Sequence, residues 1–133
     1  MMSYEKWLAC IIRAAQNIAS RDFQNEAWFS GGRVVSSPDE VYQALMEDCT
    51  FDLFFQTYGK TFSEEQARCW GELRAGLEKY YDRLPASTDA HYVLNDPEWD
   101  SVRRSAQSFV RTFNELISRG TSQDPGTISG TKG

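Results

Sequence analysis

The acidic residues of this sequence are of a type and spacing that could serve catalysis or metal binding. Paired carboxylates can act as acid and base on a substrate, and clusters of carboxylates can hold a metal ion. Most of them precede or begin expected helices, where capping and the helix dipole favour negative charge. One group is less completely explained, because it interrupts an apolar stretch and only one of its carboxylates is needed as a helix cap. The three groups are Glu47, Asp48 and Asp52, then Glu64 and Glu65, and then Asp96, Glu98 and Asp100.

The single histidine, His91, gives little support for catalysis. A nucleophile activated by a base would need His91 beside a serine or cysteine, and the sequence has neither a GxSxG motif nor a cysteine-protease signature. A di-metal carboxylate bundle needs two Glu-x-x-His motifs, which one histidine cannot supply, and no EF-hand loop is present. We therefore expect no catalytic residue, no cofactor and no metal site, with His91 in a surface loop.

The three cysteines, Cys10, Cys49 and Cys69, are odd in number and widely spaced. No CxxC pair exists, so the ligands of a zinc site are missing. Each cysteine falls in or beside an expected helix, where a small buried thiol is the usual interpretation, and a reducing compartment fits. The sequence has no secretory signal and no run of 18 apolar residues, so we expect a cytoplasmic protein that does not cross a membrane.

The charge of the chain argues against nucleic acid as its partner. The 133 residues include 19 acidic and 14 basic side chains, for a net charge of −5. Affinity for phosphate backbones depends on clustered lysine and arginine, whereas Arg103, Arg104 and Arg111 form no aromatic-interleaved basic patch. An acidic surface would steer a basic partner toward the protein, although solubility alone also explains a charge of this size.

Helical periodicity dominates the chain. Apolar residues recur at three- and four-residue steps over residues 4–19, 38–46, 51–58, 64–84 and 97–119. Ser37 followed by Pro38 and Ser63 followed by Gln66 are strong helix starts, and Asp96 precedes Pro97 in the same way. Gly59 and Gly120 are expected to end two of the helices. The sequence predicts an all-α, single-domain bundle of four to five helices over residues 1–120, followed by a disordered tail over residues 121–133.

Two features of these helices leave alternatives open. Phe51, Phe54, Phe55 and Tyr58 share one helical face, which is either core or an exposed binding patch. Gly71 and Gly76 lie inside an expected helix, where each costs about 1 kcal/mol relative to alanine. Close approach of another helix is one reason to tolerate them.

Three segments give the chain a resemblance to a known class of proteins. They are residues 37–42 (Ser-Pro-Asp-Glu-Val-Tyr), the acidic and aromatic stretch over residues 47–55, and residues 96–99 (Asp-Pro-Glu-Trp). In these segments, within residues 4–118, the chain resembles small helical immunity proteins of bacterial toxin–immunity systems. The resemblance implies a non-enzymatic inhibitor that binds a cognate toxin, often a basic nuclease, and covers its active site or another essential surface.

Two functions therefore remain open at the level of sequence. One is an immunity protein that neutralises a basic toxin domain by direct binding, and the other is a helical adaptor, regulatory or self-associating domain. Glu47, Asp48 and Asp52 are the first candidate contact residues, and Asp89, Asp96 and Asp100 form a weaker second group. The sequence leaves open whether the protein is a monomer or a homodimer.

Overall fold

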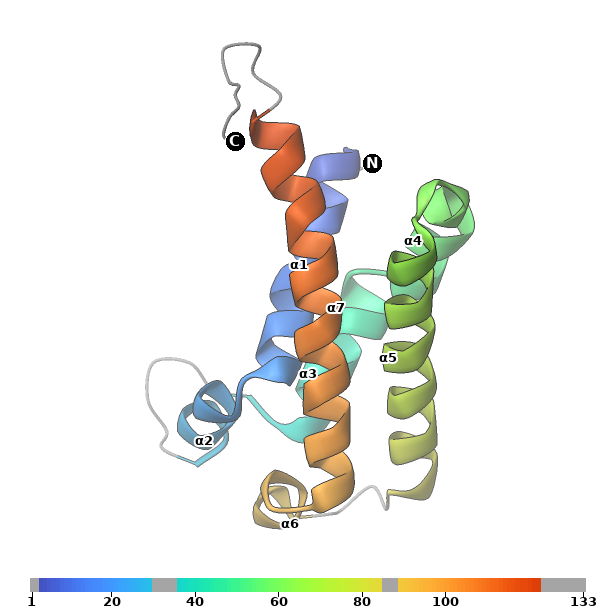
Figure 1. Cartoon of the computed structure of the whole chain (residues 1–133). Helices are drawn as coiled ribbons and strands as arrows, with labels where there is room; N and C mark the ends of the chain where they lie inside the picture. Colours follow the sequence, from blue (N-terminus) through green and yellow to red (C-terminus); the bar gives the residue numbers. More distant parts are fainter. Residues whose placement is uncertain (1–2, 30–35, 85–88, 123–133) are drawn as a thin grey trace.

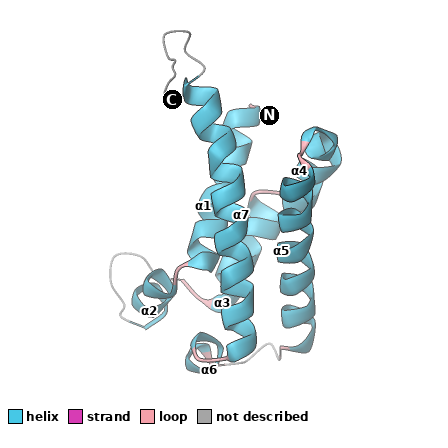
Figure 2. Ribbon diagram, in the orientation of Figure 1, coloured by secondary structure: helices cyan, strands magenta, loops and turns pink. Residues whose placement is uncertain are grey.

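The computed structural model describes residues 3–29, 36–84 and 89–122, with side chains up to Asn114, and these residues form an all-α fold (Figures 1 and 2). The expected fold class is confirmed, but the expected number of helices is too low, because the described residues contain seven α-helices. The two additional helices, α2 and α6, lie outside the five ranges in which the sequence shows helical periodicity. The elements are α1 (Tyr4–Ala19), α2 (Arg21–Phe29), α3 (Pro38–Gln43), the π-helical η1 (Ala44–Asp48), α4 (Phe51–Tyr58), the 3-10 helix η2 (Gly59–Thr61), α5 (Glu64–Arg83), α6 (Ala90–Leu94) and α7 (Pro97–Ser122).

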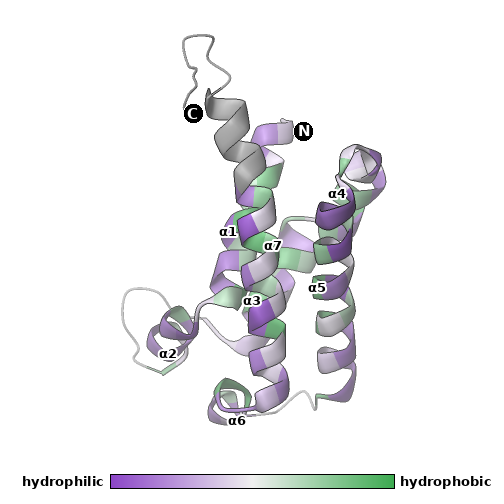
Figure 3. Cartoon of the chain, viewed as in Figure 1, coloured by the Kyte–Doolittle hydropathy of each residue, from purple (hydrophilic) through white to green (hydrophobic). Residues whose placement is uncertain are grey.

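The long helix α7 organises the fold. It packs against α1 and against α5, while α3 and η1 pack against α1 (Figure 1). The short helices α2 and α6 contact each other near the end of the bundle where α7 begins. Polar and apolar residues alternate along α5 and α7 (Figure 3), as expected for helices that bury one face.

The predicted helix starts at Ser37 and Ser63 are confirmed. The Ser37 hydroxyl accepts a hydrogen bond from the Glu40 backbone N–H at 3.1 Å, so Ser37 caps α3 with Pro38 in its first turn. Ser63 and Gln66 form a reciprocal capping box at the start of α5, with distances of 3.1 and 2.7 Å. These caps satisfy backbone donors that have no partner within the helix.

Two glycines do not end helices in the expected way. Gly59 has a φ of −58° rather than a left-handed conformation, and the chain continues into η2. Its small size is needed for another reason, because a Cβ at this position would lie 3.0 Å from the Phe55 ring. Gly120 lies inside α7, which continues to Ser122. A single interior glycine costs only about 1 kcal/mol, which a long helix tolerates. The rest of the expected tail, residues 123–133, lies outside the described residues.

The core is centred on Trp70, which is 2% exposed. Phe51 stacks on its indole with a centroid distance of 3.9 Å and an interplanar angle of 7°. Phe109 and Phe113 of α7 lie 5.4 and 5.6 Å away. Such aromatic pairs add to the free energy gained by burying apolar area.

The aromatic face of α4 is therefore divided between core and surface. Phe51 and Phe54 are fully buried, and Tyr58 is half-buried. Phe55 remains 42% exposed, and Leu53, on another side of the helix, is 51% exposed. The core interpretation is confirmed for the two buried phenylalanines, while Phe55 and Leu53 form the apolar surface of α4.

Two neighbouring tyrosines of α5 join it to other helices. The Tyr81 hydroxyl donates to the Pro38 carbonyl at the start of α3, and the Tyr80 hydroxyl donates to Asp96 Oδ2 at 2.8 Å. Burial raises the pKa of Tyr80, and the hydrogen bond to Asp96 raises it further. Burial also raises the pKa of Tyr81, with a smaller contribution from the charge of Asp39.

These shifts predict alkaline unfolding. Tyrosine has a pKa of about 10 in an unfolded chain. The pKa values of Tyr80 and Tyr81 are higher in the folded protein. Their protonated hydroxyls therefore contribute fully to stability below a pH of about 10, and this contribution is lost as the pH rises through the folded-state pKa values. We expect some of the six tyrosines to ionise only as helicity is lost, when absorbance at 295 nm and circular dichroism are followed together. Ionisation of all six near pH 10 without loss of helicity would contradict this result.

Candidate functional site

The six acidic residues predicted from the sequence do not form one cluster, and Asp52 has a partner within the fold. Asp52 lies in the first turn of α4 and binds Arg74 of α5 through two hydrogen bonds. Arg74 Nε lies 2.7 Å from Oδ1, and Nη2 lies 3.1 Å from Oδ2. This bidentate pair ties α4 to α5. The contact explains Asp52 without a binding partner.

The weaker group of candidates also has partners within the fold. Asp89 caps α6 by accepting from the His91 backbone N–H at 3.2 Å, and Asp96 accepts from the Tyr80 hydroxyl. Asp100 binds both Arg103 and Arg104. The hydrogen bond from Arg103 lowers the pKa of Asp100 below its ordinary value. Each of these three carboxylates therefore has a structural role.

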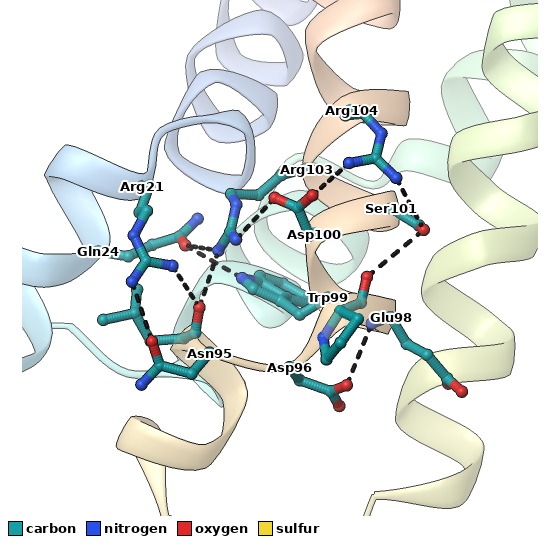
Figure 4. A network of polar contacts seen from close by, with 12 residues as sticks. Arg21, Gln24, Asn95, Asp96, Glu98, Trp99, Asp100, Ser101, Arg103 and Arg104 are labelled. Carbon is teal, nitrogen blue, oxygen red and sulfur yellow. Dashed lines mark hydrogen bonds and ion pairs between the residues drawn. The ribbon is translucent and has the colours of Figure 1, made fainter.

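Asp100 belongs to a polar network that sequence reasoning missed (Figure 4). Its centre is Gln24, which is fully buried. The Gln24 amide donates to the carbonyls of Asn17 and Ile18 at 2.9 and 2.7 Å. Its carbonyl accepts from Trp99 Nε1 at 3.0 Å and from Arg103 Nη1 at 3.2 Å. One side chain thus satisfies polar groups of α1 and α7.

Two arginines extend this network to α6. Arg103 is only 4% exposed and donates to the Leu94 carbonyl at 3.4 Å as well as to Asp100 at 2.9 Å. Arg21 of α2 donates to the same carbonyl at 2.6 Å and to Asn95 Oδ1 at 3.0 Å (Figure 4). The network joins α1, α2, α6 and α7, so we assign it a role in stability.

Glu47 and Asp48 differ from the other four candidates. Both side chains are exposed, and neither has an ion-pair or hydrogen-bond partner in the part of the chain that the structure describes. They lie at the end of η1, a π-helical segment. Such segments are rare and are frequent at functional sites. These two residues are therefore the strongest of the six candidates.

The backbone after Asp48 is strained. Thr50 has φ 49° and ψ 59°, and it is the non-glycine residue with positive φ in the described chain. A β-branched residue in the left-handed region is an outlier that costs about 1 to 3 kcal/mol. Strain of this kind is kept where the surrounding structure enforces it and is common at functional sites. We refer to residues 44–50 as the acidic turn.

Two contacts from α1 hold the acidic turn in place. Cys10 forms a disulfide with Cys49, and Trp7 Nε1 donates to the Cys49 carbonyl at 2.6 Å. Cys49 is 2% exposed. The expectation of three separate buried thiols is therefore wrong for Cys10 and Cys49, which helix packing brings together across 39 residues, and it is confirmed for Cys69.

A shallow polar hollow of about 380 Å³ lies on the α1 side of the acidic turn. Asp48 and Glu40 contribute carboxylates to its lining, and Asn17 and Gln43 contribute amides. Neighbouring carboxylates and amide oxygens suit a lysine or arginine side chain. The arrangement can therefore receive a basic group of another molecule beside Asp48.

The described residues contain no group of three or more histidine, cysteine, aspartate or glutamate side chains that could hold a metal ion. Within the same ranges, no helix has the length and apolar character needed to cross a membrane. Comparison of the chain with protein-family models, with curated proteins and with solved structures finds no significant match.

Proposed function

We propose that this chain is a non-enzymatic binding protein that neutralises a basic protein toxin by attaching to its surface, as an immunity protein does. The observation that carries the proposal is the acidic turn. Glu47 and Asp48 are exposed and have no partner among the described residues, and they lie at the end of a π-helical segment that the Cys10–Cys49 disulfide ties to α1. A binding surface that is ordered in advance loses less entropy when a partner attaches.

Charge and apolar surface support the same proposal. The net charge of −5 favours a basic partner by long-range attraction. Leu53 and Phe55 lie on α4, directly after the acidic turn, and are among the large apolar side chains that remain exposed. Acidic residues that steer a partner and aromatic residues that anchor it are the usual parts of a tight protein interface.

The partner to test first is the protein encoded by the adjacent gene, because toxin and immunity genes are expected to lie together. Glu47→Lys combined with Asp48→Lys should weaken its binding about 100-fold in calorimetric titration, since two attractive contacts become repulsive. Helicity and thermal midpoint should stay unchanged, because both side chains are unpaired within the described structure.

The matched control changes the same amount of charge elsewhere. Asp22 and Asp82 are exposed carboxylates on α2 and α5, outside the acidic turn. Asp22→Lys combined with Asp82→Lys should change the affinity by less than about threefold, because contributions from distant charges are screened by salt. Equal losses from both double variants would mean that only net charge matters. No loss from the first would remove Glu47 and Asp48 from the interface.

The second candidate function, a self-associating or adaptor domain, is favoured by the exposure of Leu53 and Phe55. A homodimer that formed through α4 would have to use these two residues, since Phe51 and Phe54 are buried within one chain. A dimer in sedimentation experiments that dissociates on Leu53→Ser and Phe55→Ser substitution would support this function in place of the first.

The cytoplasmic location expected from the sequence remains a prediction and now has a specific test. It rested in part on reduced cysteines, whereas disulfides persist mainly in oxidising compartments. Blocking free thiols in intact cells before lysis labels Cys10 and Cys49 in a reducing compartment. In an oxidising compartment it leaves the Cys10–Cys49 disulfide unlabelled.

A further inference from the structure

A groove between α4 and α5 has features that the fold itself does not explain. Its volume is about 360 Å³. Trp70, Ala67 and Gly71 of α5 line it together with Phe55 of α4, and Asp52 and Arg74 lie at its edge. The Trp70 indole N–H is buried and has no hydrogen-bond partner among the described residues. The groove is thus mainly apolar and bordered by charge.

Gly71 is not required by packing among the residues that the structure describes. A Cβ at this position would meet none of their atoms within 4 Å. Glycine inside a helix costs about 1 kcal/mol relative to alanine, so the residue lowers stability without an internal benefit. Ala67, one turn earlier, and Ala75, one turn later, are also exposed. Small residues one turn apart allow a second helix to pack closely against α5.

Phe55 is an anchor held in position before any partner arrives. Its ring lies against Gly59, where a Cβ would come within 3.0 Å. The rings of Trp70 and Phe62 lie 5.8 and 5.9 Å from it. Despite these contacts Phe55 is 42% exposed. An aromatic ring that is fixed yet uncovered binds at a low entropic cost.

Charged residues that line the groove, or that lie near its lining residues in the sequence of α5, indicate what kind of partner fits. Arg68 lies between Glu65 and Glu72, at 3.9 and 3.1 Å. Arg74 lies between Asp52 and Glu78, at 2.7 and 2.8 Å. Each cluster has two carboxylates and one guanidinium, which leaves one negative charge on each. A partner with lysine or arginine beside its apolar residues complements this edge, whereas a second copy of the chain would bring the same negative charge to it.

From these observations we propose that the groove between α4 and α5 binds an amphipathic α-helix of a basic protein partner. An apolar side chain of that helix sits between Phe55 and Gly71, and its basic residues contact the two carboxylate clusters. The inference rests on the proposed function in one respect only, since the helix is expected to belong to the toxin that the acidic turn attracts.

The test uses variants of two glycines on the same helix. Gly71→Leu fills the groove and should weaken binding of the adjacent gene's product at least tenfold. Gly76→Ala is the matched control, because its Cβ would lie 3.9 Å from Val102, in ordinary contact with α7 and outside the groove. It should leave the affinity unchanged. Both variants should raise the thermal midpoint, so lost binding cannot be attributed to unfolding.

A synthetic peptide tests the groove independently of the proposed function. We would titrate an 18-residue helical peptide with a leucine stripe and flanking lysines into labelled protein and follow amide chemical shifts by NMR. Shifts at Phe55, Ala67 and Gly71 that disappear in Gly71→Leu support the groove. Equal shifts with a glutamate-flanked peptide, or shifts elsewhere, overturn the proposal.

The two experiments together separate the proposals. If the peptide occupies the groove but the adjacent gene's product does not bind the chain, the groove stands and the toxin assignment falls. If Gly71→Leu binds that product normally while the Glu47 and Asp48 double variant does not, the groove proposal falls and the function stands. A concentration-dependent dimer that Gly71→Leu abolishes would assign the groove to a second copy and overturn the inference.

Discussion

Replacing Gln24 with leucine is expected to lower the free energy of unfolding by about 3 to 5 kcal/mol. Gln24 is fully buried and makes four hydrogen bonds, two to carbonyls at the end of α1 and two from Trp99 and Arg103. Leucine has a similar size but leaves all four groups without that partner. The loss at Arg103 is the most costly, because this charged residue is itself only 4% exposed. Domains of this size have total stabilities of about 5 to 15 kcal/mol, so the variant should be close to unfolding.

Urea unfolding followed by circular dichroism measures this effect, and Gln107 provides the matched control. Gln107 also donates to a carbonyl at the end of α1, that of Ala19 at 3.1 Å, but it is exposed. Gln107→Leu should cost less than about 0.5 kcal/mol, because water replaces the lost bond. Similar urea midpoints for the two variants would show that the buried network does not stabilise the protein.

The difference between these two glutamines also shows what sequence can predict. Helix starts depend on residues three apart, so Ser37 and Ser63 could be assigned as caps from the sequence alone. The network around Gln24 joins residues that are 75 and 79 positions apart, and no local pattern marks such a pairing. A polar residue within an otherwise irregular stretch looks the same whether it is exposed or buried.

The candidate site was predictable to a similar degree. Glu47 and Asp48 attract attention because they interrupt an apolar stretch, and the structure leaves both unpaired in its described part. Asp52 has the same sequence signal, yet Arg74, 22 residues away, binds it. The π-helical turn and the left-handed Thr50 could not be foreseen, because the neighbouring Cys49 is bound by Cys10 and Trp7, which lie 39 and 42 residues away in the sequence.

The contribution of the Cys10–Cys49 disulfide to stability can be measured by removing it. Cys10→Ser combined with Cys49→Ser opens a covalent loop of 39 residues. The entropy regained by the unfolded chain is expected to lower the free energy of unfolding by about 4 kcal/mol. The same loss should follow when the unmodified protein is reduced, and the reductant should have no effect on the double variant. A reductant effect of equal size in both proteins would point to a cause other than this bond.

The part of the protein that loses stability distinguishes a disulfide that stabilises the whole fold from one that shapes the binding surface. Thr50 keeps a conformation that costs free energy, so it should relax once Cys49 is released from α1. Amide exchange should then accelerate first in the acidic turn, while the core around Trp70 remains protected. The affinity for the basic partner should fall at the same time. Uniform acceleration across the chain with unchanged affinity would mean that the disulfide stabilises the fold but does not order Glu47 and Asp48. Since both carboxylates lie within two residues of Cys49, their positions depend directly on this one covalent link.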